Sequence, residues 1–271
     1  TRSAQLGVEP DEATRQLYKR LFDKVFALES PAPPISHPLV GREDEWKELM
    51  SAWQQATSSG IHLHLLRGET GIGKTRLAEE FLLWAKRQGL ATATAVCYES
   101  GSGTSFAPLA AWLRACPLHR LASHQRREVG RILPELLAEG DAAPAPISEG
   151  WQQVGFFEAL SQALLSGEQP LILLLDDLQW CDRDTLDWLK YLIRAQPAAK
   201  MMIVATLREG ESLDPALDSS LYSLLRQQDR LSESNLPRLN AQQTAALAAS
   251  IGGRAITEAH ISPNSEAGPH S

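Results

Sequence analysis

Residues 68–75 read GETGIGKT and decide the fold, because they match the pattern G-x-x-x-x-G-K-[ST] of a phosphate-binding loop. The apolar run Ile61–Leu66 before this stretch favours a strand, and RLAEEFLLWAKRQG after it favours a helix. Glycines let the backbone turn its N–H groups onto phosphate oxygens, and the following helix presents its positive N-terminus to the same anion. The sequence therefore predicts a nucleotide-phosphate site between a strand and a helix.

The side chains of this loop have separate expected roles. Lys74 is expected to reach the β- and γ-phosphates, and the Thr75 hydroxyl is expected to bind Mg²⁺. The alternative is a plain glycine turn at the start of a helix. The residues expected to contact ATP or ADP in this loop are Gly68, Glu69, Thr70, Gly71, Ile72, Gly73, Lys74, Thr75 and Arg76.

A second polar site follows the apolar run in LILLLDDLQW, residues 171–180. In a parallel sheet the carboxyl end of this strand lies at the same edge as the phosphate loop, which is the Walker B arrangement. Asp176 is expected to hold Mg²⁺, and Asp177 is expected to orient and activate the attacking water. The alternative is that the acidic pair only opens a turn.

A third polar site ends the apolar stretch MIVATLRE, residues 202–209. Thr206 can sense the γ-phosphate there, and the Arg208 guanidinium can stabilise transferred charge. The alternative is an exposed arginine beside Glu209. The candidate catalytic residues are thus Lys74, Asp177 and Arg208, and the expected reaction is the hydrolysis of ATP by water to ADP and phosphate.

Composition limits the other classes of function. The 271 residues are 43% hydrophobic with a formal net charge of −7, which argues against a nucleic-acid surface along the whole chain. No apolar stretch reaches the roughly 20 residues of a membrane span, so no membrane partner is expected. Three widely spaced cysteines show no disulfide or zinc pattern and favour the cytoplasm. His62 and His64 share a strand face and are expected to pack rather than bind metal.

Strand and helix patterns alternate after a proline-rich segment, which predicts an α/β fold with a parallel sheet sandwiched by helices. The chain opens on Thr1, which suggests a fragment of a longer protein. The expected organisation is a helical segment at 1–29, a linker at 30–38, a P-loop ATPase core at 39–213, a further helical segment at 214–252 and a poorly ordered tail at 253–271.

Four stretches together resemble the signal-transduction ATPases with numerous domains (the AAA-like STAND class), and most closely the large bacterial LuxR and antibiotic-regulatory type. These stretches are PLVGREDEWKELMSAW, LLRGETGIGKTRLAEEF, LILLLDDLQWCDRDTLDWLKYL and IVATLRE. The resemblance implies that Val40, Gly41 and Arg42 lie beside the adenine and ribose. It also implies that Thr206 and Arg208 form a T-x-R sensor.

The first residues carry a second resemblance. AQLGVEPDEATRQLYKRLF, residues 4–22, is similar to the end of a bacterial transcriptional activator domain. This implies that DNA is bound only through domains outside this chain, that an unidentified inducer acts on the protein, and that ATP can drive self-association. LNAQQTAALAASIGG resembles the first helix of the family's lid, which implies that residues 214–252 are the start of a helical lid, whereas the closing SPNSEAGPHS departs from the family's pattern.

Three functions stay open on the sequence. The first is a regulatory ATPase switch, in which ATP with Mg²⁺ and ADP favour different states. The second is a small-molecule or protein kinase that uses the same loop, although no acceptor-binding signature is visible. The third is a scaffold in which nucleotide only stabilises the fold, and the acidic pair at 176–177 argues against it.

Overall fold

The structure is a computed structural model that describes residues 39–99, 105–116, 118, 121–137, 144–167, 170–210 and 215–252. The predictions for the N-terminal helix, the proline-rich linker and the C-terminal tail lie outside these residues. Gly41–Leu239 form one compact unit, and Leu39, Val40 and the residues from Asn240 belong to another.

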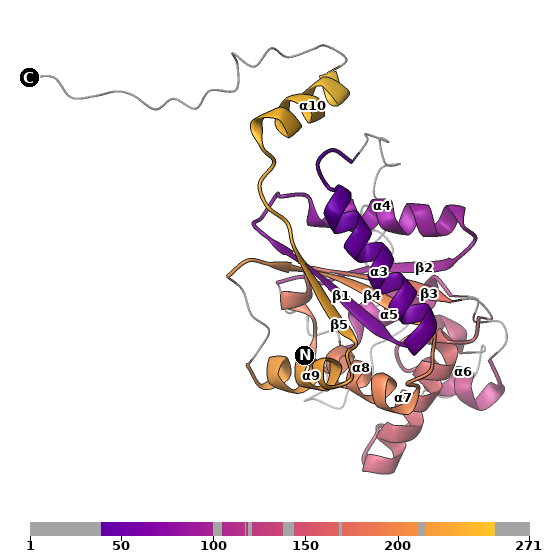
Figure 1. Cartoon of the computed structure of the whole chain (residues 1–271). Helices are drawn as coiled ribbons and strands as arrows, with labels where there is room; N and C mark the ends of the chain where they lie inside the picture. The colour runs from indigo at the N-terminus through magenta and orange to yellow at the C-terminus, as the bar shows by residue number, and fades with distance from the viewer. Residues whose placement is uncertain are drawn as a thin grey trace, which may run out of the picture. The chain divides into compact units, whose positions relative to one another are not determined.

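A parallel sheet of five strands, in the order β2-β3-β4-β1-β5, organises the described part of the larger unit (Figure 1). In the register of the strands, Gly68 of β1 lies opposite Arg208 of β4, and Val96 of the edge strand β2 lies opposite Asp176 of β3. The predicted α/β fold is therefore confirmed. The strands are β1 (His62–Gly68), β2 (Ala91–Val96), β3 (Leu171–Asp176), β4 (Met201–Arg208) and β5 (Leu231–Asn235).

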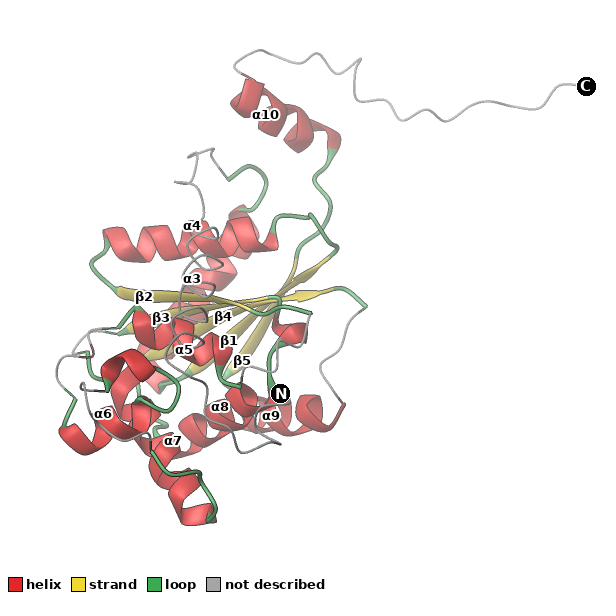
Figure 2. Cartoon of the chain, turned by 180° about the vertical axis from the view of Figure 1, so that it is seen from behind, coloured by secondary structure: helices red, strands yellow, loops and turns green. Residues whose placement is uncertain are grey.

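Helices cover both faces of this sheet, so that the central strands are buried from both sides (Figure 2). Figure 2 shows α3 and α4 on one face, and α5, α7, α8 and α9 on the other, with α6 beside α7. The helices of the larger unit are α3 (Glu43–Ser59), α4 (Lys74–Arg87), α5 (Ala107–Arg114), α6 (Ser123–Val129), α7 (Gly150–Leu164), α8 (Arg183–Ala195) and α9 (Pro215–Gln227), with short 3₁₀ turns η2 (Pro134–Leu136) and η3 (Leu178–Trp180).

The apolar runs of the sequence explain this burial. Every residue of β3 is buried, and so is every residue of β4 before Arg208, as expected for strands covered on both faces. Helix α8 begins after Asp182, whose carboxylate accepts the Thr185 N–H, and buries its apolar stripe against the core. These contacts fix the carboxyl edge of the sheet, where β1, β3 and β4 end together.

Strand β5 corrects one expectation, since residues 231–235 were predicted as part of a helical segment. The sequence LSESN lacks an apolar pattern, but it pairs with β1 along its length. Two serines of β5 meet histidines of β1: Ser232 Oγ lies 2.8 Å from His62 Nε2, and Ser234 Oγ lies 2.9 Å from His64 Nε2. Hydrogen bonds between side chains of β1 and β5 thus stabilise a strand that the hydrophobic periodicity of the sequence does not indicate.

The second unit contains one described helix, α10 (Ala241–Gly252), at the place where the first helix of a lid was expected. Asn240 precedes it, and its side chain accepts the Gln243 N–H. No helix among the described residues of the chain has both the length and the apolar character that a membrane crossing requires.

Candidate functional site

The phosphate loop joins the end of β1 to the start of α4, as the sequence predicts. Gly73 precedes the helix with a φ of 102°, a left-handed conformation that favours glycine. A Cβ at Gly73 would meet no atom within 4 Å, so the backbone conformation rather than crowding requires glycine there. Helix α4 therefore begins at Lys74 with its N-terminus at the loop.

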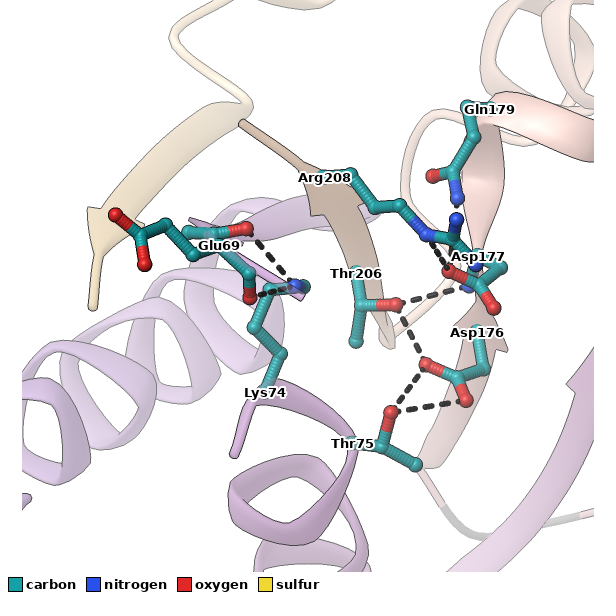
Figure 3. Close-up of polar contacts among 9 residues, drawn as sticks. Glu69, Lys74, Thr75, Asp176, Asp177, Gln179, Thr206 and Arg208 are labelled. Carbon is teal, nitrogen blue, oxygen red and sulfur yellow. Dashed lines mark hydrogen bonds and ion pairs between the residues drawn. The ribbon is translucent and has the colours of Figure 1, made fainter. Parts of the chain in front are cut away.

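Lys74 folds its side chain back across the loop (Figure 3). Its Nζ lies 2.9 Å from the Gly68 carbonyl oxygen and 2.9 Å from the Glu69 carbonyl oxygen, and the side chain is buried. Backbone carbonyls thus hold a buried ammonium at the loop, where it can meet an anion.

Asp176 ends β3 and is held by two hydroxyl groups from distant parts of the chain. Thr75 Oγ1, in the first turn of α4, lies 2.9 Å from Asp176 Oδ1 and 3.0 Å from Oδ2. The Thr206 hydroxyl, from β4, donates to Asp176 Oδ1 (Figure 3). Burial raises the pKa of Asp176, and the two hydroxyl hydrogen bonds oppose that rise. A buried carboxylate of this kind is suited to a cation.

Asp177 turns away from the strand in a left-handed conformation, with a φ of 55°. Its N–H donates to Thr206 Oγ1 at 2.8 Å, so the Thr206 hydroxyl fixes both acidic residues. The Asp177 carboxylate accepts a hydrogen bond from Gln179 Nε2 at 2.8 Å, and its Oδ1 lies 3.4 Å from Arg208 Nε. Because of the left-handed conformation at Asp177, the carboxylates of Asp176 and Asp177 have different hydrogen-bond partners.

Most of the predicted site residues meet at this edge of the sheet. Figure 3 shows Thr75 pointing toward Asp176, with Thr206 and Arg208 beside the acidic pair and Lys74 turned toward the backbone at Glu69. Glu69, Thr70 and Gly71 are exposed in the loop, and Arg76 forms an ion pair with Glu80 along α4. Gln179 was missed, although its position two residues after the acidic pair was a usable signal.

The segment before α3 reaches the phosphate loop through Arg42. The Arg42 guanidinium is buried, and its Nη2 lies 3.0 Å from the Ile72 carbonyl oxygen in the phosphate loop. Gly41 precedes it with a φ of 68°. Val40 belongs to the other unit of the chain, so its expected contact with the nucleoside stays a prediction.

His62 and His64 lie at the sheet interior, away from this set of residues. Both are buried and bonded to serines of β5, and burial lowers the pKa of His64 to about 4. Among the described residues, no group of three histidine, cysteine or acidic side chains could hold a metal ion. Both imidazoles thus pack between β1 and β5 with hydroxyl partners.

The residues present fit the phosphates of a nucleotide together with Mg²⁺. Lys74 and the helix N-terminus supply positive charge at the loop, while the adjacent Thr75 hydroxyl and Asp176 carboxylate offer the oxygen ligands that Mg²⁺ prefers. The raised pKa of Asp176 also reports a buried carboxylate that a cation would stabilise. When bound, Mg²⁺ supplies positive charge that stabilises phosphate oxygens during transfer.

Three solved structures illustrate the similarity to known proteins. Cdc6p of Pyrobaculum aerophilum is 16% identical with a TM-score of 0.48, over 84% of this chain and 52% of that one. The Orc1 protein of Aeropyrum pernix, solved in complex with DNA, is 20% identical to this chain with a TM-score of 0.45, and the match covers 79% of this chain and 50% of Orc1. A RuvB variant of Thermotoga maritima is 17% identical to this chain with a TM-score of 0.41, and the match covers 81% of this chain and 54% of RuvB. The match thus spans about half the length of each of these proteins.

A protein family matches most of the chain in sequence. No curated protein matches the chain, but residues 38–204 match the family described as the AAA ATPase domain. The matched residues make up more than half of the 271, and they include both the phosphate loop and the acidic pair at 176–177. The chain therefore belongs to the AAA ATPase domain family.

Proposed function

We propose that this chain binds ATP with Mg²⁺, hydrolyses it slowly, and serves as the nucleotide switch of a bacterial transcriptional regulator of the STAND class. The observation that carries the hydrolytic part is the bridge made by Thr206. One hydroxyl fixes Asp176 toward Thr75 and fixes the backbone of Asp177 in a different direction. Two adjacent carboxylates can therefore take two tasks.

Lys74 and the N–H groups of the loop bind the phosphates, while Thr75 and Asp176 would hold Mg²⁺. Asp177 orients a water molecule and accepts its proton as the water oxygen attacks the γ-phosphorus. The bond from the γ-phosphorus to the bridging oxygen breaks, and ADP leaves with that oxygen. Arg208, which lies at the Asp177 carboxylate, stabilises the charge that develops on the transferred phosphoryl group.

The regulatory part rests on resemblance in sequence. The run DDLQWCDRDTLDWL continues the acidic pair as STAND proteins do, and residues 4–22 resemble the end of an activator domain. In this proposal ATP favours a self-associating state and ADP a closed one, in response to an inducer. DNA binding belongs to domains outside residues 1–271, and the few, widely spaced cysteines favour the cytoplasm.

Nucleotide binding and phosphate release test the catalytic part in the full chain. We expect Lys74→Ala to abolish ATP binding measured by titration calorimetry, because it removes the buried ammonium at the loop. Lys86→Ala is the matched control, since Lys86 is an exposed lysine at the far end of the same helix. Equal ATP affinity in Lys74→Ala and the wild type would contradict the phosphate-site assignment.

The products distinguish the alternatives. Release of phosphate with water as the only acceptor supports the ATPase, whereas ADP formation that requires an added acceptor supports a kinase. Bound ATP that stays intact supports the nucleotide-stabilised scaffold. For the switch, sedimentation of the chain with a non-hydrolysable ATP analogue should show larger species than with ADP, and identical sedimentation would count against it.

A further inference from the structure

Arg42 lies immediately before α3 and is a buried arginine with partners in three segments. Its side chain is only 5% exposed, which arginine tolerates when its donors are satisfied. Nη1 lies 3.1 Å from Glu45 Oε1 and 2.9 Å from the Pro237 carbonyl oxygen, and Nη2 lies 3.0 Å from the Ile72 carbonyl oxygen. One guanidinium thus joins α3, the phosphate loop and the chain that leaves β5.

The bond to Ile72 has a consequence for the loop. In a planar trans peptide the carbonyl of one residue and the N–H of the next point in opposite directions. A guanidinium that fixes the Ile72 carbonyl therefore also fixes the direction of the Gly73 N–H, next to Lys74. Arg42 can orient a phosphate-binding N–H without touching the nucleotide.

The segment at 236–238 supports the loop from the same side. The Leu236 N–H donates to the Arg67 carbonyl at 2.8 Å, and a Cβ placed on Gly68 would lie 3.1 Å from the Leu236 carbonyl oxygen. Arg238 donates two hydrogen bonds to the Glu69 carboxylate, each at 2.9 Å. The exposed pair formed by Arg238 adds little stability by itself, but it lies on the same segment that Arg42 anchors.

We infer that Arg42 is a positioning residue for the phosphate loop, acting through the Ile72 carbonyl, and that Pro237 and Glu45 fix its guanidinium. The inference rests on the proposed binding of ATP in this loop. It differs from the contact with adenine and ribose that the resemblance implies for Arg42. The two roles affect different parts of the ligand, so they can be separated by experiment.

The test compares ATP, GTP and inorganic tripolyphosphate, which carries the phosphates without a nucleoside. Calorimetry of Arg42→Lys should show the binding of ATP and of tripolyphosphate weakened by the same factor, about tenfold, because a single ammonium replaces the two separate Nη atoms that bond Pro237 and Ile72. The ratio of ATP to GTP affinity should stay unchanged. Weakened ATP binding with unchanged tripolyphosphate binding would overturn the inference and favour the nucleoside contact.

Two further variants make the result interpretable. Arg230→Lys is the matched control, because Arg230 also bonds two backbone carbonyls, of Pro197 and Ser59, at the opposite end of the strands. It should leave both affinities unchanged. If Arg42→Lys fails to fold by circular dichroism, Glu45→Gln weakens the same contact and should lower both affinities together by about threefold.

The wild type and Lys74→Ala separate failure of this inference from failure of the proposed function. A wild-type chain that binds neither ATP nor tripolyphosphate would contradict nucleotide binding itself. A wild type that binds both, a Lys74→Ala that binds neither, and an Arg42→Lys that binds both normally would overturn only the role of Arg42.

Discussion

Thr75 and Asp176 are 101 residues apart in the sequence, and the Thr75 hydroxyl lies within 3.0 Å of both carboxylate oxygens of Asp176. The first turn of α4 and the end of β3 therefore already face each other at the distance of a hydrogen bond. Both residues were predicted as Mg²⁺ ligands from their positions in two separate motifs. Their contact means that the two oxygen donors need little rearrangement to meet one cation.

The first prediction concerns this pair. Mg²⁺ is expected to increase the affinity of the wild type for ATP, and Thr75→Val should lose most of this increase because valine has the shape of threonine but lacks the hydroxyl oxygen. We expect the affinity of Thr75→Val for ATP with Mg²⁺ to be about tenfold lower than that of the wild type. Thr75→Ser keeps the hydroxyl and should behave like the wild type. Calorimetry of ATP binding with Mg²⁺ and with EDTA measures the difference, and a valine variant with full Mg²⁺ dependence would exclude Thr75 as a ligand.

The second prediction separates binding from hydrolysis at Asp177. We expect Asp177→Asn to bind ATP normally and to release phosphate about 100-fold more slowly, because the amide cannot accept the proton of water. Asp187→Asn, which changes an aspartate on α8 that pairs with Lys190, should keep the wild-type rate. Single-turnover phosphate release measures both, and unchanged hydrolysis in Asp177→Asn would remove its catalytic assignment.

The third prediction tests the bridge made by Thr206. Thr206→Val should slow phosphate release and also destabilise the fold by about 1–3 kcal/mol, because the Asp177 N–H loses its acceptor and Asp176 loses a donor. Thr206→Ser restores the hydroxyl and should recover most of both properties. Urea unfolding together with phosphate release measures the two effects, and a valine variant as stable and active as the wild type would refute the bridge.

The parts of the site that the sequence predicted are those encoded by short continuous motifs. The loop at 68–75 and the acidic pair at 176–177 were expected at one edge because parallel strands end on the same side of a sheet. Thr206 was expected at that edge as well, but its two hydrogen bonds to consecutive residues depend on the left-handed turn at Asp177, which no periodicity indicates.

The parts that were missed depend on contacts between distant residues. Strand β5 carries the polar sequence LSESN, and its bonds to His62 and His64 come from residues about 170 positions away. Arg42 meets Pro237 across 195 positions, so the motif around Arg42 could not reveal that its guanidinium supports the phosphate loop. Strand β5 and the contacts of Arg42 therefore depend on tertiary packing, and the local sequence pattern indicates neither of them.

The fourth prediction uses the buried histidine of β1. The pKa of His64 is lowered from 6.5 to about 4 by burial, with a smaller contribution from neighbouring His62. Between pH 6.5 and pH 4, His64 binds a proton in the unfolded chain but stays neutral in the folded chain. The free energy of unfolding should therefore fall as the pH drops from 6.5 toward 4. At about 1.4 kcal/mol per pKa unit, His64 alone accounts for roughly 3 kcal/mol of this loss.

Urea unfolding of the wild type and of His64→Gln at several pH values between 7 and 4 measures this effect. Glutamine can still bond the serines of β5 but does not titrate, so the variant should lose the part of the slope that begins below pH 6.5. His124→Gln is the matched control, because it makes the same substitution at an exposed histidine on α6. Carboxylates that titrate at lower pH are common to all three chains, so the difference between slopes reports the loss of His64 together with its effect on neighbouring His62, whose pKa burial also lowers. Parallel slopes in the wild type and His64→Gln would show that His64 accepts its proton equally well in the folded and the unfolded chain.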